Sequence, residues 1–159
     1  MIWSTLATLV QAIGIVVGFV FAVMMTTSLI ASRRYETNRG EERAENVRFV
    51  IPTVATENVR SALIETIQHT VERFPQYEVY CVVDEGSDLQ ADLLARDDIS
   101  TVVVPDSYDP DAVAKGRAIE YFVETVVVDA PEYWYGFIDD DNRILDDAFL
   151  REIPHYEAR

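Results

Sequence analysis

The first 32 residues contain no charged side chain, and this run limits the fold of the chain more than any other feature. A helix over residues 1–32 would be roughly 45 Å long, which exceeds the ~30 Å apolar thickness of a bilayer. The alternative is a cleaved signal peptide, but no basic residue precedes the run and the run is far longer than a signal core. We therefore expect residues 1–32 to form a transmembrane helix.

Basic residues begin directly after the apolar run, at Arg33, Arg34, Arg39 and Arg43. Basic flanks of membrane helices remain on the cytoplasmic side. The pattern predicts a single N-terminal anchor in the cell membrane, with the rest of the chain in the cytoplasm. Residues 33–47 mix both signs of charge without an apolar stripe, which indicates a juxtamembrane linker before a folded domain at residues 48–159.

The residues after 32 hold all 28 acidic and all 13 basic side chains, for a net charge of -15. This composition argues against nucleic acid as a partner, because phosphate binding needs basic patches. It is typical of a halophile-like protein that stays soluble at high salt. Cys81 is the only cysteine, so no internal disulfide can form, and its apolar surroundings predict a buried side chain. His69 and His155 belong to no cluster with zinc-ligand spacing.

Strand and helix patterns alternate along the rest of the chain. Apolar or β-branched runs predict strands at residues 48–53, 78–84, 100–104 and 134–138. Apolar residues at helical spacing predict helices from Val59 to before Pro75, at 90–96, at 113–127, and after Asp146 or Asp147 as N-cap. This order predicts an α/β fold with a doubly wound, mostly parallel, Rossmann-like sheet.

Polar residues end several of the predicted strands, namely Thr53, Asp84, Glu85 and the three carboxylates at 139–141. In parallel sheets of this kind, ligands bind beyond the carboxyl ends of the strands. We therefore expect these side chains to lie along one edge of the sheet.

The run Tyr-Gly-Phe-Ile at 135–138 leads directly into Asp139, Asp140 and Asp141. If the strand continued, Asp139 and Asp141 would share one face and could bind the same Mg2+ or Mn2+ ion. The alternative is a solvated turn, because Asp is common in turns. An EF-hand is excluded, since Arg143 and Ile144 stand where an oxygen ligand and a glycine are needed.

Two further motifs could contact a nucleotide. Asp84 and Glu85 precede Gly86 and Ser87, where a carboxylate can accept a hydrogen bond from a base and the glycine permits a tight turn. An ordinary strand-to-helix turn would have the same composition. Lys115 and Arg117 flank a glycine early in a predicted helix and could neutralise phosphate oxygens, unless they merely lie on a solvated face.

In this order, the motifs resemble those of the family 2 glycosyltransferases of the GT-A fold. Val-Ile-Pro-Thr at 50–53 is similar to the opening of that family, and Val-Asp-Glu-Gly-Ser-Asp at 83–88 is similar to its base-binding turn, with Glu85 in place of an Asp. Lys-Gly-Arg-Ala at 115–118 resembles its Gly-Lys-x-x-Ala segment, and the carboxylates at 139–141 match its Asp-x-Asp metal motif.

The resemblance implies a UDP- or GDP-sugar donor and a divalent metal, Mg2+ or Mn2+. It assigns nucleotide binding to Pro52, Thr53, Glu57, Asp84, Glu85, Lys115, Arg117, Asp139 and Asp140, and metal binding to Asp139 and Asp141. The chain also resembles membrane β-1,4-mannosyltransferases of the egghead type at residues 104–108, 115–121 and Trp134. This resemblance implies GDP-mannose as the donor and a glycolipid as the acceptor.

The resemblance covers residues 48–150, the donor-binding half of such enzymes. In the family, the acceptor-binding segment and the catalytic base lie further along, so no catalytic residue is assigned and we expect a truncated, N-terminal half. The expected function is part of an inverting, membrane-anchored transfer of a hexose to a lipid-linked or saccharide acceptor. The alternative is a membrane-tethered nucleotide-binding or partner-binding module without turnover.

Overall fold

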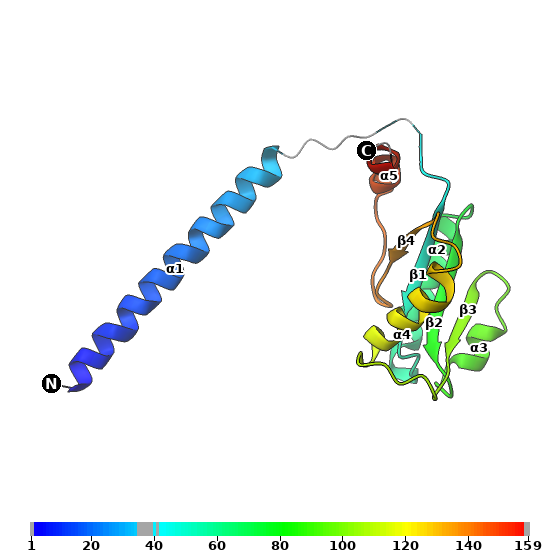
Figure 1. Ribbon diagram of the computed structural model, residues 1–159, viewed down its shortest axis with the longest axis horizontal. Helices are drawn as coiled ribbons and strands as arrows, with labels where there is room; N and C mark the ends of the chain where they lie inside the picture. The colour runs from blue at the N-terminus through cyan, green and yellow to red at the C-terminus, as the bar shows by residue number, and fades with distance from the viewer. Residues whose placement is uncertain (1, 35–39, 41, 158–159) are drawn as a thin grey trace. The chain divides into compact units, whose positions relative to one another are not determined.

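The computed structural model describes residues 2–34, 40 and 42–157, and the side chains from residue 11 to 33 within the first helix (Figure 1). Contacts divide the chain into two compact units, Met1–Arg39 and Gly40–Arg159. Residues 35–39 and 41 of the predicted linker, including Arg39, lie outside the described residues.

The first unit contains one long helix, α1 (Ile2–Arg34). Its segment Gln11–Arg33 has a mean hydropathy of 2.3, and none of the most apolar part is buried against the protein. The Thr26 and Thr27 hydroxyls donate to Ala22 O at 2.8 Å and Val23 O at 3.0 Å, so the helix itself satisfies these polar groups. Helix α1 is therefore long and apolar enough to cross a membrane, a test of length and composition that an N-terminal signal sequence also passes.

The second unit is an α/β domain with a four-stranded sheet, in which the described strands are all parallel and lie in the order β3-β2-β1-β4 (Figure 1). The strands are β1 (Val47–Pro52), β2 (Glu78–Asp84), β3 (Ser100–Val104) and β4 (Trp134–Phe137). The predicted α/β class, strand positions and parallel sheet are confirmed. The central strand β1 is buried along most of its length, as expected of a strand covered on both faces.

Helices cover both faces of this sheet. One face carries the helices α2 (Arg60–Arg73), α3 (Gln90–Leu94) and α5 (Ala148–Glu157), and a 3-10 turn, η1 (Glu57–Val59), directly precedes α2. The other carries α4 (Lys115–Phe122), which continues as the π-helix η2 (Val123–Val127). Phe49 and Ile51 point into the first layer and Val50 into the second, in agreement with the period-2 alternation of a strand.

The segment before β1 packs against the last helix. Pro154 has no backbone N–H, so it cannot donate to the carbonyl of Leu150 four residues earlier. That carbonyl instead accepts a hydrogen bond from the Ala44 amide at 2.8 Å, and Tyr77 Oη donates to Ala44 O at 2.6 Å. The end of the predicted linker therefore makes contacts of the folded domain.

The strand order reverses between β1 and β4. From β1 the chain moves to β2 and β3 on one side, and then returns to place β4 on the other side. In α/β sheets, ligands bind beyond the carboxyl ends of the strands at such a reversal of the strand order. Thr53 directly follows β1, and the three carboxylates follow Ile138, the first residue after β4.

Candidate functional site

Thr53 and Asp140 bring the ends of β1 and β4 together in the interior. Thr53 N–H donates to Val82 O at 3.0 Å, and the Ile138 amide donates to Val50 O at 2.9 Å. The sheet hydrogen bonds therefore continue one residue past the end of β1 and of β4. The Thr53 hydroxyl then donates to Asp140 Oδ2 at 2.6 Å. Thr53 is 2% exposed and Asp140 is 5% exposed, so this hydrogen bond is shielded from water.

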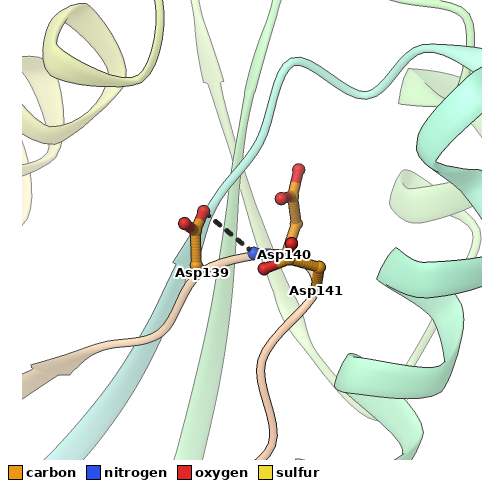
Figure 2. Close-up of side chains that lie close together, drawn as sticks. All are labelled: Asp139, Asp140 and Asp141. Atoms are coloured by element: carbon orange, nitrogen blue, oxygen red, sulfur yellow. Dashed lines mark hydrogen bonds between the residues drawn. The ribbon is translucent and has the colours of Figure 1, made fainter.

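The three carboxylates do not continue strand β4, and the expected reason for their convergence is wrong. β4 ends at Phe137, and a hydrogen bond of 3.0 Å from the Asn142 amide to Asp139 O closes a turn over residues 139–142. The turn directs Asp140 inward and leaves Asp139 and Asp141 exposed. Ligand atoms of all three still lie within 4.8 Å of one another, and Figure 2 shows them on this one turn.

Lys115 joins the carboxylate turn to helix α4, of which it is the first residue. Its ammonium group donates to Asp139 Oδ1 and, at 2.7 Å, to Asp140 Oδ1. Burial disfavours the charged form of Lys115, but the hydrogen bonds with Asp139 and Asp140 outweigh it and raise the pKa of Lys115. The hydrogen bond from Lys115 lowers the pKa of Asp139. Both groups are therefore charged at neutral pH, and Lys115 links the exposed carboxylate of Asp139 to the buried carboxylate of Asp140.

Helix α2 holds the backbone of the carboxylate turn and of the residues that follow it. Thr66 Oγ1 donates to Asp140 O at 3.1 Å, His69 Nε2 contacts Ile144 O at 3.0 Å, and Arg73 Nη2 donates to Leu145 O at 2.7 Å. These three side chains are spaced three and four residues apart, so they lie on one face of the helix. No role was predicted for these three residues, although polar side chains at this helical spacing could have indicated the face that binds the turn.

Two alanines beside the site have an unusual backbone. Ala55 has a φ of 46° and Ala114 a φ of 51°, and no other non-glycine in the described part of the chain has a positive φ. Ala55 follows Thr53 by two residues, and its amide donates to Thr53 Oγ1 at 3.1 Å. Ala114 directly precedes Lys115. Strain of this kind persists where the surrounding structure imposes it, and it clusters at functional sites.

Asp84 and Arg117, which were expected to contact a base and a phosphate, form an ion pair with each other. Arg117 also donates through Nη2 to Pro105 O at 2.6 Å and through Nε to Tyr108 O at 3.0 Å. Three contacts from one guanidinium therefore tie α4 to the end of β2 and to the loop after β3. Arg117 holds this part of the edge together.

The remaining predicted residues surround this centre less closely. Glu85 Oε2 accepts a hydrogen bond from the Asp106 amide at 3.0 Å, and Gly86 has the positive φ, 75°, that its turn requires. Glu57 is exposed and pairs with Arg60 at 2.7 Å. Pro52 is buried as the last residue of β1. The structure thus unites Thr53, Lys115, Asp139, Asp140 and Asp141, with the pair of Asp84 and Arg117 connected through α4.

Cys81 is fully buried in β2, as predicted. Burial and the charge of Asp140 raise the pKa of its thiol to about 12, so the thiolate is essentially absent at neutral pH. Cys81 is a packing residue and takes no part in the chemistry of the site.

A cavity of about 360 Å3 adjoins the turn at Asp139 and is lined mainly by apolar side chains, including Phe49, Phe137 and Phe149. A cavity of about 970 Å3 lies at the opposite, amino end of the strands, beside Glu45 and Tyr77. The carboxylate turn is nevertheless where charge converges, and in the described part of the chain only residues 139–141 group three metal-type ligands.

No protein-family model matches the chain, and searches of curated proteins and of solved structures find no match. The resemblance to family 2 glycosyltransferases therefore rests on the sequence motifs and stays a prediction.

Proposed function

We propose that the domain binds a nucleotide-diphosphate sugar together with Mg2+ or Mn2+, as the donor-binding part of a membrane-anchored, family 2-like glycosyltransferase. The observation that carries this proposal is the convergence of Thr53, Lys115 and the carboxylate turn at the strand ends where the strand order reverses. In α/β sheets this position favours phosphorylated ligands. The strand order and the helices on both faces are consistent with a Rossmann-like, GT-A domain.

The donor atoms of the turn fit a hard divalent cation, which prefers carboxylate oxygens. Asp139 and Asp141 would hold the ion, because both are exposed and their oxygens lie close together. Asp141 has no hydrogen bond or ion pair within the described residues and is free to serve as a ligand. Asp140 would act as a support, since its two oxygens already accept from Thr53 and Lys115.

A bound divalent ion would neutralise the charge that develops on the diphosphate as the sugar leaves. The chain's own residues would orient that diphosphate: Lys115 would add a positive charge beside it. Asp84, held by Arg117, and Glu85, fixed to the Asp106 amide, would border the base.

The apolar helix α1 supports a location at the membrane, and the Arg residues that follow it favour a cytoplasmic domain. Anchoring would keep the site near a membrane-held acceptor. A lipid-linked or saccharide acceptor of a hexose is therefore part of the proposal, and GDP-mannose with a glycolipid is its narrowest form.

A membrane-tethered nucleotide-binding module without turnover is the second candidate. The observation that favours it is that Asp84, Asp139 and Asp140 each pair with Lys115 or Arg117, and Asp141 is the proposed metal ligand, so none of these four carboxylates is assigned to deprotonate an acceptor.

The proposal predicts metal-dependent binding of UDP- or GDP-sugars to the full chain in detergent. Isothermal titration calorimetry with UDP-glucose, GDP-mannose, UDP and GDP, each with Mn2+ and again with EDTA, measures it. We expect one base to be preferred and EDTA to remove the binding. Binding that is absent for both bases, or unaffected by EDTA, would contradict the proposal. Incubation with radiolabelled donor and a lipid extract then separates transfer from binding alone.

A further inference from the structure

We propose that Lys115 is a tethered counter-ion that couples metal binding to diphosphate binding. In the protein alone its ammonium group pairs with both Asp139 and Asp140. When a divalent ion binds Asp139, the ammonium group moves to the phosphate oxygens. This inference rests on the proposed function and concerns how the same site is regulated.

The contacts of Lys115 show that a metal ion would compete with it for one carboxylate. Lys115 Nζ donates to oxygens of both Asp139 and Asp140. The Asp139 side chain is 50% exposed, whereas the Asp140 side chain is 7% exposed and its other oxygen accepts from Thr53. A cation arriving from solvent therefore reaches Asp139, together with Asp141, but not Asp140. Asp139 is the shared ligand.

Charge repulsion makes the competition strong. A divalent ion on Asp139 would lie close to the Lys115 ammonium, and like charges at such short range oppose each other. The metal alone must therefore displace Lys115 from Asp139 and meets a cost in doing so. A diphosphate lowers that cost, because its oxygens offer the displaced ammonium a new anionic partner.

The side chain of Lys115 is suited to changing its binding partner. The chain has 13 basic residues, and Lys115 is the only Lys among them. An ammonium on a flexible four-carbon chain can change partners, whereas a guanidinium binds carboxylates in a fixed, bidentate geometry. Arg117, two residues further along α4, is held in place by three separate acceptors, namely the Asp84 carboxylate and the backbone carbonyl oxygens of Pro105 and Tyr108.

Thermodynamic linkage turns this into a measurable quantity. If the diphosphate raises the affinity for the metal by some factor, the metal raises the affinity for the diphosphate by the same factor. Removing the charge of Lys115 should strengthen binding of the metal alone and reduce this coupling factor. Replacing Lys115 by Arg should weaken binding of the metal alone.

The experiment titrates Mn2+ into the full chain in detergent and counts free Mn2+ by electron paramagnetic resonance, without nucleotide and with UDP or GDP, correcting for Mn2+ bound by free nucleotide. We expect Lys115→Gln to bind Mn2+ alone about 10-fold more tightly than the wild type and to lose most of the coupling, which typically ranges from about 5- to 150-fold. Lys115→Arg should bind Mn2+ alone more weakly. Unchanged or weaker Mn2+ binding by Lys115→Gln, or an unchanged coupling factor, would overturn the proposal.

Arg143→Gln is the matched control, because it removes one positive charge two residues from Asp141 while its partner is Glu65, on α2. Its Mn2+ affinity should differ less than about 3-fold from that of the wild type, since the charge is exposed and screened. A 10-fold increase in the Mn2+ affinity of Arg143→Gln would show that the loss of any nearby positive charge has the same effect as the loss of Lys115, and would contradict the proposal.

Lys115→Gln leaves buried Asp140 without its cation, so its folding is checked by thermal melting. If the variant is weakened, Mn2+ should raise its melting temperature more than that of the wild type, because a tighter ligand stabilises more. If Lys115→Gln does not fold, Lys115→Arg tests the proposal instead. This variant should bind Mn2+ more weakly than the wild type, and an equal or higher affinity rejects the proposal.

The two proposals fail in different ways. A wild type that binds Mn2+ but neither UDP nor GDP rejects the proposed function, while the affinity of Lys115→Gln for Mn2+ alone still decides the role of Lys115. A wild type that binds no Mn2+ rejects both.

Discussion

Replacing Asp141 by Asn is expected to weaken Mn2+ binding at least ~100-fold and to remove metal-dependent nucleotide binding. Loss of a residue that only supports a metal ligand already costs about 10- to 100-fold, and Asp141 is proposed as a ligand itself. Because Asp141 has no partner within the described residues, the substitution should leave the fold intact. Calorimetry with Mn2+ and with the preferred nucleotide measures both effects on the full chain in detergent.

Asp129→Asn is the matched control for this prediction. Asp129 is also exposed, but it precedes β4 and so lies toward the opposite end of that strand. The control removes the same charge and should leave both affinities within about 2-fold, since an exposed charge at that separation is screened. Equal losses in Asp141→Asn and Asp129→Asn would show that net charge, rather than a metal site, governs the binding.

Replacing Asp140 by Ala is expected to lower the free energy of unfolding by about 3 kcal/mol, the largest stability effect we foresee at this edge. Asp140 is buried and accepts hydrogen bonds from Thr53 at 2.6 Å and from Lys115 at 2.7 Å. Removing it leaves the Thr53 hydroxyl without its acceptor and removes one of the two carboxylates that bind Lys115. Denaturant unfolding of the full chain in detergent, followed by tryptophan fluorescence, measures the loss.

Two substitutions bracket this effect. Asp140→Asn keeps an oxygen acceptor but loses the charge, so its loss should be smaller than that of Asp140→Ala. Asp141→Ala removes an exposed carboxylate and should change stability by less than about 0.5 kcal/mol. If Asp140→Ala were as mild as Asp141→Ala, the buried contacts of Asp140 would not stabilise the domain as described.

The strands were predictable because each combines a local pattern with clear boundaries. β2 and β3 are β-branched or apolar runs, and Pro105 follows the second directly. Helix α4 was harder, since the apolar spacing over 113–127 shows neither the positive φ of Ala114 nor the change to π-helical hydrogen bonding. Neither the positive φ nor the π-helical hydrogen bonding can be recognised from the residue types, because tertiary contacts impose both.

At the site, the sequence indicated which residues gather but not which pairs they form. The parallel order of the strands predicted that Thr53, Asp84 and the carboxylates share an edge, and this edge is observed. The pairing of Asp84 with Arg117 depends on how α4 approaches the end of β2, which is a long-range property. The turn at 139–142 was weighed as an alternative, but the burial of Asp140 within it follows from Thr53 and Lys115, residues distant in sequence.

Asp139 and Asp141 are proposed to bind one divalent ion beside a diphosphate. Anomalous diffraction at the manganese edge, from crystals of the full chain grown with Mn2+ and the preferred nucleotide, is the decisive test. We expect one Mn2+ within about 2.2 Å of carboxylate oxygens of both residues, with phosphate oxygens completing its coordination. A Mn2+ ion bound elsewhere, with Lys115 still joining Asp139 to Asp140 and the nucleotide remote from the turn, would contradict it.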